Sequence, residues 1–411
     1  MRRVLILLSI LLPLMLVGCV SMGLPKVSAR GADEPARPLI APQAETLDSW
    51  NAARAPLLEA FEREVYGTYP DLGETVVLDR TLVDVGAFGG RGDIEEYHLR
   101  MAGQETYLVT ITPADAGEPV PTIILQMFCG NRAALGGRED ITSGPNDPGC
   151  DPNSWFAGAI RMVFGRHIME PPIDDILDRG YALAIIYPGD VVPDRSTSGL
   201  AALDVMMPET PSGAITVWAW VYSRVVDVLD ADPRYDPART AVWGHSRNGK
   251  SALLAAVYDP RIDLVISHQA GTGGTTLSRS HAGESIGQIT ESYPHWFAPA
   301  YAEYAGNEEA LSVDQHQLIA LAAPRPVLIG GAWRDQWSDP QGSFRAARSA
   351  NPVYALYGSD GLRQPSMSDF DPTADLALFM RGGLHGVQPS DWDNFFAFLD
   401  AHFQPSNPHT E

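Results

Sequence analysis

Short apolar runs rich in β-branched residues alternate with stretches of helical period along most of this chain. This alternation predicts an α/β protein with a mainly parallel sheet and helices on both faces. It is most distinct over residues 240–274, where a strand, a sharp turn, a helix and a second strand follow one another. Active sites of such sheets lie beyond the carboxyl ends of the strands. The runs that we interpret as strands are Tyr107–Thr112, Thr122–Phe128, Ala182–Tyr187, Thr240–Trp243, Leu264–Ser267, Pro326–Gly330 and Leu376–Met380.

The first 19 residues have the pattern of an export signal. Arg2 and Arg3 precede an apolar run over residues 4–17 that is short for a membrane span, and Gly18 and Cys19 follow it. Leu-Val-Gly-Cys at 16–19 resembles the bacterial lipobox, in which the cysteine is acylated; an ordinary signal peptide with an incidental cysteine is the alternative. Residues 20–45, rich in Pro, Ala and Gly, predict a flexible tether, and residues 46–405 predict one folded domain.

The composition excludes several classes of partner. The chain has 411 residues, of which 29 are Lys or Arg and 51 are Asp or Glu, so its formal net charge of −22 argues against a nucleic-acid-binding protein. Its three cysteines are Cys19, Cys129 and Cys150, without the Cys and His spacing of a zinc site, and we expect no metal. After export, Cys129 and Cys150 form either a disulfide or two buried free thiols, and the sequence leaves both open.

A candidate nucleophile follows the strand at residues 240–243. Residues 244–250 read Gly-His-Ser-Arg-Asn-Gly-Lys and precede a helix that we expect to start near Ser251. A strand, a sharp turn and a helix form the nucleophile elbow, which projects a serine Oγ above the sheet, so Ser246 is the predicted nucleophile. Asn248 stands where the usual motif has its last glycine. The alternative is that Ser246 only caps the helix.

The longer string resembles the glucuronoyl esterases, carbohydrate esterase family 15. Asp-Pro-Arg-Ile at 259–262, Gly-Thr-Gly-Gly at 271–274 and Trp-Ser-Asp-Pro at 337–340 support the resemblance, which covers most of residues 50–400 in matching order. It implies an α/β-hydrolase fold, a three-layer sandwich, for the catalytic domain at 46–405. It also implies a cofactor-free enzyme that cleaves esters between lignin alcohols and the 4-O-methyl-glucuronic acid of glucuronoxylan.

The resemblance also implies roles for individual residues. Ser246 is the nucleophile, and Arg247 offers its side chain and backbone N–H to the oxyanion, which needs preorganised donors. Lys250 and Glu284 bind sugar hydroxyls, and Trp337 packs on the uronate ring. The plainer alternatives are solvated surface charges for Lys250 and Glu284 and core packing for Trp337.

The catalytic base and acid are predicted from chain order. A serine needs an imidazole to remove its proton, and His385, in Gly-Gly-Leu-His-Gly at 382–386, follows the last predicted strand. The family's fungal pattern places the acid where this chain has Gln269, which cannot carry the charge that stabilises an imidazolium. Either the enzyme is impaired or Asp335, after the strand at 326–330, is the acid. For Asp339 we favour a turn role.

Together these features predict a serine esterase that acts through a covalent acyl-enzyme. We expect a monomer whose substrate is glucuronoxylan or a lignin-carbohydrate ester. We expect it to be exported, either to the cell envelope (outer membrane or periplasm), where only its lipid would hold it on a membrane, or as a secreted protein. Loops over 132–172 and 193–213 show no readable pattern and are expected to rim the cleft. The alternatives are an acetyl xylan or other carbohydrate esterase on the same fold, or a catalytically inactive cell-surface glycan-binding protein, which the neutral Gln269 at the acid position suggests.

Overall fold

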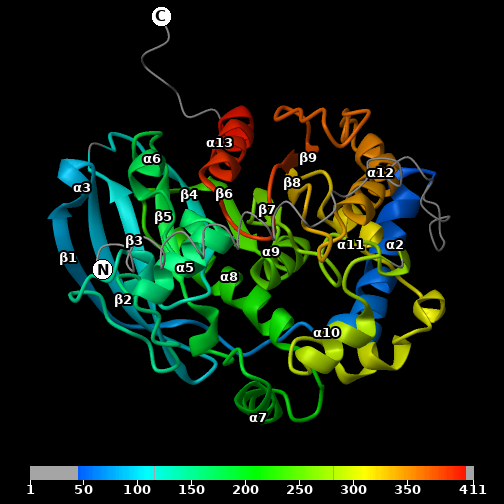
Figure 1. The fold of residues 1–411 in the computed structure, drawn as a ribbon, viewed down its shortest axis with the longest axis horizontal. Coiled ribbons are helices and arrows are strands. Elements are labelled where there is room, and N and C mark those ends of the chain that lie inside the picture. The colour runs from blue at the N-terminus through cyan, green and yellow to red at the C-terminus, as the bar shows by residue number, and fades with distance from the viewer. Residues whose placement is uncertain (1–44, 115, 281, 404–411) are drawn as a thin grey trace, which may run out of the picture.

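The structure, a computed structural model, describes residues 45–403 apart from 115 and 281, so the predicted signal and most of the predicted tether lie outside the described residues. A nine-stranded sheet runs across the molecule in the order β1-β2-β3-β5-β4-β6-β7-β8-β9 (Figure 1). Its first four strands in this order pair antiparallel, and the strands from β5 to β9 pair parallel. The strands are β1 Val76–Gly86, β2 Gly92–Met101, β3 Gln104–Pro113, β4 Val120–Gln126, β5 Ala182–Ile186, β6 Tyr235–His245, β7 Leu264–His268, β8 Val327–Ala332 and β9 Leu376–Arg381.

Helices cover both faces of this sheet, as the sequence pattern predicts. One hydrophobic core lies between the sheet and a layer that includes α8, α9, α11 and α12, and a second core lies between the opposite face and a layer that includes α6 and α13. Within the described residues, no helix is both long and apolar enough to cross a membrane. The helices are α2 Leu47–Phe61, α3 Ala87–Gly90, α4 Asn131–Ala134, α5 Trp155–Phe164, α6 Ile173–Leu177, α7 Ser196–Met206, α8 Ala214–Asp230, α9 Arg247–Tyr258, α10 Ile286–Ser292, α11 Gln315–Ala322, α12 Pro340–Leu356 and α13 Pro389–Phe403.

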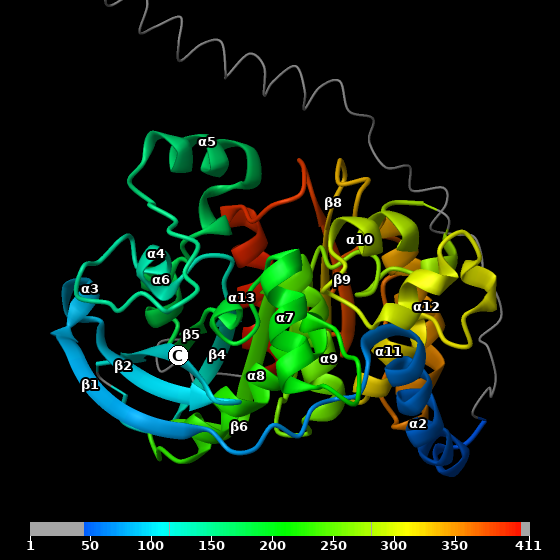
Figure 2. The ribbon, with the colours of Figure 1, turned by 90° about the horizontal axis from the view of Figure 1, so that it is seen from below.

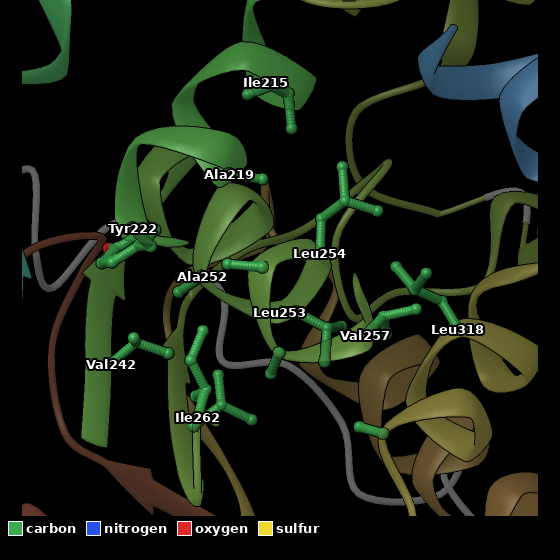
Figure 3. Close-up of a cluster of buried hydrophobic side chains, with 14 of the residues drawn as sticks. Ile215, Ala219, Tyr222, Val242, Ala252, Leu253, Leu254, Val257, Ile262 and Leu318 are labelled. Carbon is green, nitrogen blue, oxygen red and sulfur yellow. The ribbon is translucent and has the colours of Figure 1, made fainter. Parts of the chain in front are cut away.

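Strand β6 shows how the sheet separates the two cores. Val242 belongs to the core beneath α8 and α9, whereas its neighbours Ala241 and Trp243 belong to the core beneath α13. Successive side chains of a strand point to opposite faces, so a central strand covered on both faces must be apolar throughout. Figure 3 shows Val242 below Ala252 of α9 and close to Tyr222 of α8. This packing fixes the position of α9, and with it the turn that begins this helix.

The seven predicted strands are confirmed to within a few residues at their ends, but the sequence interpretation missed β1 and β2. Strand β1 is the edge of the sheet and is mostly exposed, so it shows no apolar face. Its pairing with β2 also contains register shifts between Val77 and Asp79 and between Leu82 and Asp84. Bulges of this kind interrupt the two-residue alternation on which strand prediction depends.

Three further differences concern the segments around the predicted site. The helix expected near Ser251 begins at Arg247, so Lys250 lies in its first turn. The loops without a readable pattern contain α5 and α7, which contribute few residues to the cores. Cys129 and Cys150, whose state the sequence left open, form a disulfide.

Candidate active site

The turn between β6 and α9 has the geometry of a nucleophile elbow. Ser246 has φ 55° and ψ −122°, a conformation that is strained for any residue with a Cβ. Gly244 is required because a Cβ there would lie 1.9 Å from the carbonyl oxygen of Asn248. Asn248 itself is buried and donates to the carbonyl of Gln126 at the end of β4 (3.0 Å). The Ser246 side chain makes no cap hydrogen bond to the helix, which argues against the capping alternative.

His385 and Asp335 form a hydrogen-bonded pair at the carboxyl ends of β9 and β8. The Nδ1 of His385 lies 2.9 Å from Oδ2 of Asp335 and 3.2 Å from Oγ of Ser338. A carboxylate only accepts, so Nδ1 carries the proton and Nε2 is left as the basic nitrogen. Burial opposes ionisation of Asp335, but the hydrogen bond and charge of His385 and the bonds from Ser338 hold its pKa below the usual range. Asp335 is therefore an ionised partner for an imidazolium.

Gln269 occupies a different position from an acid partner. Its Oε1 accepts from the backbone N–H of Gly386 (2.8 Å), and its Nε2 donates to the carbonyl of Leu384 (3.4 Å). These two peptide groups flank His385 on either side in the sequence. The amide of Gln269 therefore holds the loop that carries the imidazole in place, and these two hydrogen bonds require one donor and one acceptor. No sequence pattern indicates this role, because the two partners are backbone groups 115 and 117 residues away.

Arg247 lies at the first position of α9, where its backbone N–H has no partner inside the helix. Its guanidinium pairs with Asp194 (Nε to Oδ2, 2.6 Å) and lies over the ring of Phe128, with 4.3 Å from Cζ to the ring centre. Asp194 also accepts from His295 (3.0 Å) and from Trp296 (2.8 Å). The side chain of Arg247 is therefore held in place beside the turn that carries Ser246. Asp194 comes from the loop at 193–213, and the sequence pattern did not single it out.

Lys250 and Glu284 are both buried, so neither is the surface charge of the plainer interpretation. The ammonium of Lys250 donates to the carbonyls of Ala270 and Thr272, which uses two of its three donors. Burial lowers the pKa of Lys250 to about 8, although the charge of Glu284 opposes the shift. Burial raises the pKa of Glu284, opposed by Lys250 and His385. Oε1 of Glu284 has no hydrogen-bond partner in the part of the chain that the structure describes.

One cavity of about 380 Å³ brings these residues together. Trp337 lines it and is 52% exposed, which contradicts core packing for this residue. Its backbone carbonyl accepts from the N–H of Glu284 (3.0 Å), so the two segments are joined. Asp335 lies behind His385, and Asp339 caps α12 by accepting from the N–H of Gly342 (3.0 Å). The residues that line the cavity are Phe128, Phe164, Ile168, His245, Ser246, Arg247, Lys250, Gln269, Ala270, Gly271, Glu284, Tyr293, Trp296, Trp337, Ser338 and His385.

The structure thus brings together six of the predicted site residues around one cavity, with Asp335 directly behind them. The predicted lipidation residue Cys19 lies outside the described residues. Sequence reasoning missed the aromatic lining, including Phe128, Tyr293 and Trp296, because isolated aromatic residues are most often core residues and carry no motif.

Several known proteins are similar to this chain in sequence or in fold. A family model described as "Glucuronyl esterase, fungi" matches residues 200–358. The chain is 34% identical over 371 residues to carbohydrate esterase MZ0003 from an unknown prokaryotic organism, which is 86% of this chain and 85% of that protein. It is 30% identical over 209 residues to 4-O-methyl-glucuronoyl methylesterase 1 of Wolfiporia cocos, 48% of this chain and 50% of that one. The glucuronoyl esterase structure from Solibacter usitatus aligns over 90% of this chain and 99% of that chain, with TM-score 0.73 and 28% identity.

The fold and the site define a carboxylic ester hydrolase with the α/β-hydrolase fold, and the fold expected from the sequence is confirmed. A "promiscuous CE15 esterase" from a marine bacterial metagenome aligns with 93% of this chain and 98% of that chain at TM-score 0.76 and 30% identity. The chain belongs to the glucuronoyl esterases, carbohydrate esterase family 15.

Proposed function

We propose that this protein hydrolyses the ester between 4-O-methyl-D-glucuronic acid of glucuronoxylan and the alcohols of lignin, through a covalent acyl-enzyme on Ser246. The observation that carries the proposal is the His385–Asp335 pair at 2.9 Å, whose imidazole lines the same cavity as Ser246 and the buried Lys250 and Glu284. This pair also argues against an inactive hydrolase, because the charge that Gln269 lacks is supplied by Asp335.

The reaction follows from the arrangement of these groups. The imidazole of His385 takes the hydroxyl proton of Ser246 as Oγ bonds to the carbonyl carbon of the ester, and Asp335 stabilises the imidazolium. The backbone N–H and guanidinium of Arg247 offer donors to the negatively charged oxygen, where one donor is typically worth about 3 kcal/mol. The alcohol leaves with the proton of His385. A water then attacks the carbonyl carbon of the acyl-enzyme and gives a proton to His385, which passes it to the departing Oγ of Ser246 as the glucuronic acid is released.

The sugar side of the proposal rests on Lys250 and Glu284. The ammonium of Lys250 has one remaining donor, and the carboxylate of Glu284 has an unpartnered oxygen. The ammonium can therefore donate to one hydroxyl group of a sugar, and the carboxylate can accept from a neighbouring one. The exposed face of Trp337 fits the apolar face of a pyranose ring. The acyl part of an acetyl ester has no hydroxyl groups or pyranose ring for these side chains to bind, so their place in one cavity favours a glucuronate ester over an acetyl ester.

The test is a comparison of two ester classes. Wild-type enzyme should hydrolyse methyl or benzyl 4-O-methyl-glucuronate with a far higher kcat/KM than acetylated xylan, and a phosphonate should label Ser246 covalently. The Ser246→Ala variant serves as the control for both measurements. Preferential hydrolysis of acetyl groups would instead support an acetyl xylan esterase, and absence of labelling would support an inactive protein.

We also propose that the protein is exported and anchored in the cell envelope through an acylated Cys19. The support is the lipobox at 16–19 followed by a tether-like composition. The Cys19→Ala variant should move the protein from the membrane fraction to the soluble fraction. Wild-type protein that already fractionates as soluble would contradict the anchor, without bearing on the esterase activity.

A further inference from the structure

A carboxylate from outside the elbow links three side chains beside Ser246. Oδ2 of Asp194 lies 2.6 Å from Nε of Arg247, and its Oδ1 lies 3.0 Å from Nε2 of His295 and 2.8 Å from Nε1 of Trp296. Asp194 comes just before α7, and the other two residues follow α10. Both helices lie on the lower side of the molecule in Figure 1, the side that Figure 2 shows from below. Two distant loops therefore meet at the guanidinium of Arg247.

Asp194 keeps its negative charge although its side chain is only 15% exposed. Burial by itself would raise the pKa of this carboxyl, but the hydrogen bond from His295, the charge of Arg247 and the hydrogen bond from Trp296 hold the pKa below its usual range. An ionised carboxylate only accepts, so Nε2 of His295 carries a proton. Arg247 therefore faces a negative charge that is fixed from the opposite side by two donors.

The guanidinium of Arg247 is held without being used up. Its Cζ lies over the ring of Phe128 at 4.3 Å and over the ring of Trp296 at 5.9 Å from the ring centres, and its Nε is the atom nearest Asp194. Within the described part of the chain, its two terminal nitrogens have no hydrogen-bond partner. Arg247 lines the cavity, so these nitrogens remain available to a substrate oxygen.

We propose that Asp194 is a positioning residue that holds the guanidinium of Arg247 ready for the negatively charged oxygen of the transition state. The inference rests on the role of Arg247 in the proposed function and adds to it the residue that prepares this donor. A donor lowers the barrier most when it is already in place as the charge develops. A flexible arginine needs an anchor for this, and the donors from His295 and Trp296 make Asp194 a rigid one.

The test is a cycle of variants measured on an aryl acetate and on methyl 4-O-methyl-glucuronate. Asp194→Asn keeps the shape of the side chain and one oxygen for His295 and Trp296, but removes the charge that faces Arg247. It should lower kcat about tenfold on both esters, because both pass through an oxyanion, and should change KM less than about twofold. In the Arg247→Ala enzyme, the same substitution should change kcat less than about twofold, because a positioning residue acts through the group that it positions.

The matched control is Asp259→Asn. Asp259 is buried, caps the far end of α9 and pairs with Arg261 (2.7 Å), so this substitution breaks a similar charge pair on the same helix. It should leave kcat unchanged, even if it lowers the melting temperature as much as Asp194→Asn does. If Asp194→Asn does not fold, Trp296→Phe takes its place in the cycle, because it removes one donor to Asp194 and keeps an aromatic ring. Its smaller loss of kcat, about threefold, should likewise depend on Arg247.

Several results would overturn the proposal. They are an unchanged kcat in folded Asp194→Asn, an equal loss in Asp259→Asn, and a loss confined to KM. A loss of kcat that is the same with and without Arg247 would also overturn it, since Asp194 would then act on the fold. Wild-type enzyme that hydrolyses the aryl acetate but not the glucuronate ester would instead contradict the proposed substrate, and the cycle on the aryl acetate would still decide the role of Asp194.

Discussion

The catalytic cavity has two sides that differ in how completely their polar groups are paired. Around His385, Asp335 binds the imidazole and the N–H of Ser338, and Gln269 binds both peptide groups beside the histidine. On the other side, Glu284 keeps an oxygen without a partner among the described residues. The two buried carboxylates also shift in opposite directions: the pKa of Asp335 is lowered, and the pKa of Glu284 is raised.

The difference separates Asp335, which supports proton transfer by His385, from Glu284, which we expect to bind the substrate. A buried carboxylate keeps its charge when the protein supplies hydrogen bonds and an opposite charge, as it does for Asp335. Glu284 has lost its solvation without full replacement, so its free oxygen would gain a strong hydrogen bond from a substrate hydroxyl. We infer that the His385 side is complete before substrate binds, whereas the Lys250–Glu284 side is completed by the substrate.

Removing the charge of the paired carboxylate should have the largest effect. Asp335→Asn should lower kcat by up to about four orders of magnitude, because the amide cannot stabilise the imidazolium and favours the wrong tautomer of His385. Steady-state kinetics measures the loss, and an unchanged melting transition shows that the variant is folded. Near-normal turnover of a folded Asp335→Asn enzyme would assign the acid elsewhere. Restored activity in Asp335→Asn, Gln269→Glu would show that a carboxylate at residue 269 also reaches the imidazole.

The oxyanion donor is expected to follow. Arg247→Ala should lower kcat about 100-fold or more and change KM less, because donors to the oxyanion strengthen as charge develops in the transition state. Arg247→Lys keeps a charge but loses the planar group that pairs with Asp194, and serves as the comparison. A change confined to KM would place Arg247 in ground-state binding.

Substitutions of Lys250 or Glu284 should change kcat/KM only for substrates that carry the sugar. Glu284→Gln keeps the shape of the side chain but removes its charge, and a hydrogen bond to a charged group is worth about 1.5–3 kcal/mol. The ratio of kcat/KM for a glucuronate ester to that for an aryl acetate should therefore fall roughly 10- to 100-fold. Equal losses on both substrates would contradict a role in sugar binding.

Substitution of Gln269 tests whether His385 depends on the two hydrogen bonds that hold its loop. Gln269→Ala leaves the N–H of Gly386 without its partner, so kcat should fall by about tenfold while KM stays close to normal. Gln269→Glu should lose one of the two hydrogen bonds at neutral pH, because a carboxylate cannot donate to the carbonyl of Leu384. An unchanged kcat in Gln269→Ala would show that the other contacts of the loop are sufficient.

The smallest effect is a pH dependence that belongs to the binding side alone. Because burial lowers the pKa of Lys250 to about 8, the ammonium loses its charge as the pH rises through that value. KM for glucuronate esters should then rise several-fold between pH 7 and 9, whereas KM for an aryl acetate should not. The rise should disappear in Lys250→Met. A rise that persists in this variant would assign the titration to another group.

The sequence by itself determined the central strands, the elbow and the candidate catalytic residues. The interior strands are covered on both faces and so must be apolar, and the elbow carries a local motif whose spacing is set by backbone sterics around Gly244. His385 and Asp335 could be placed because the ends of parallel strands meet at one edge. The family resemblance supplied the sugar-binding residues Lys250 and Glu284.

Only the tertiary structure decided which groups touch. Gln269 reads as a missing acid in the sequence, and its actual partners are the backbone atoms of a loop more than 100 residues away. The edge strand β1 was missed because it buries no regular apolar face, which is the signal that periodicity detects, and because register shifts interrupt its alternation. A linear pattern records burial and local turns, but the pairing of side chains across the fold depends on distances that the chain acquires only when it closes upon itself.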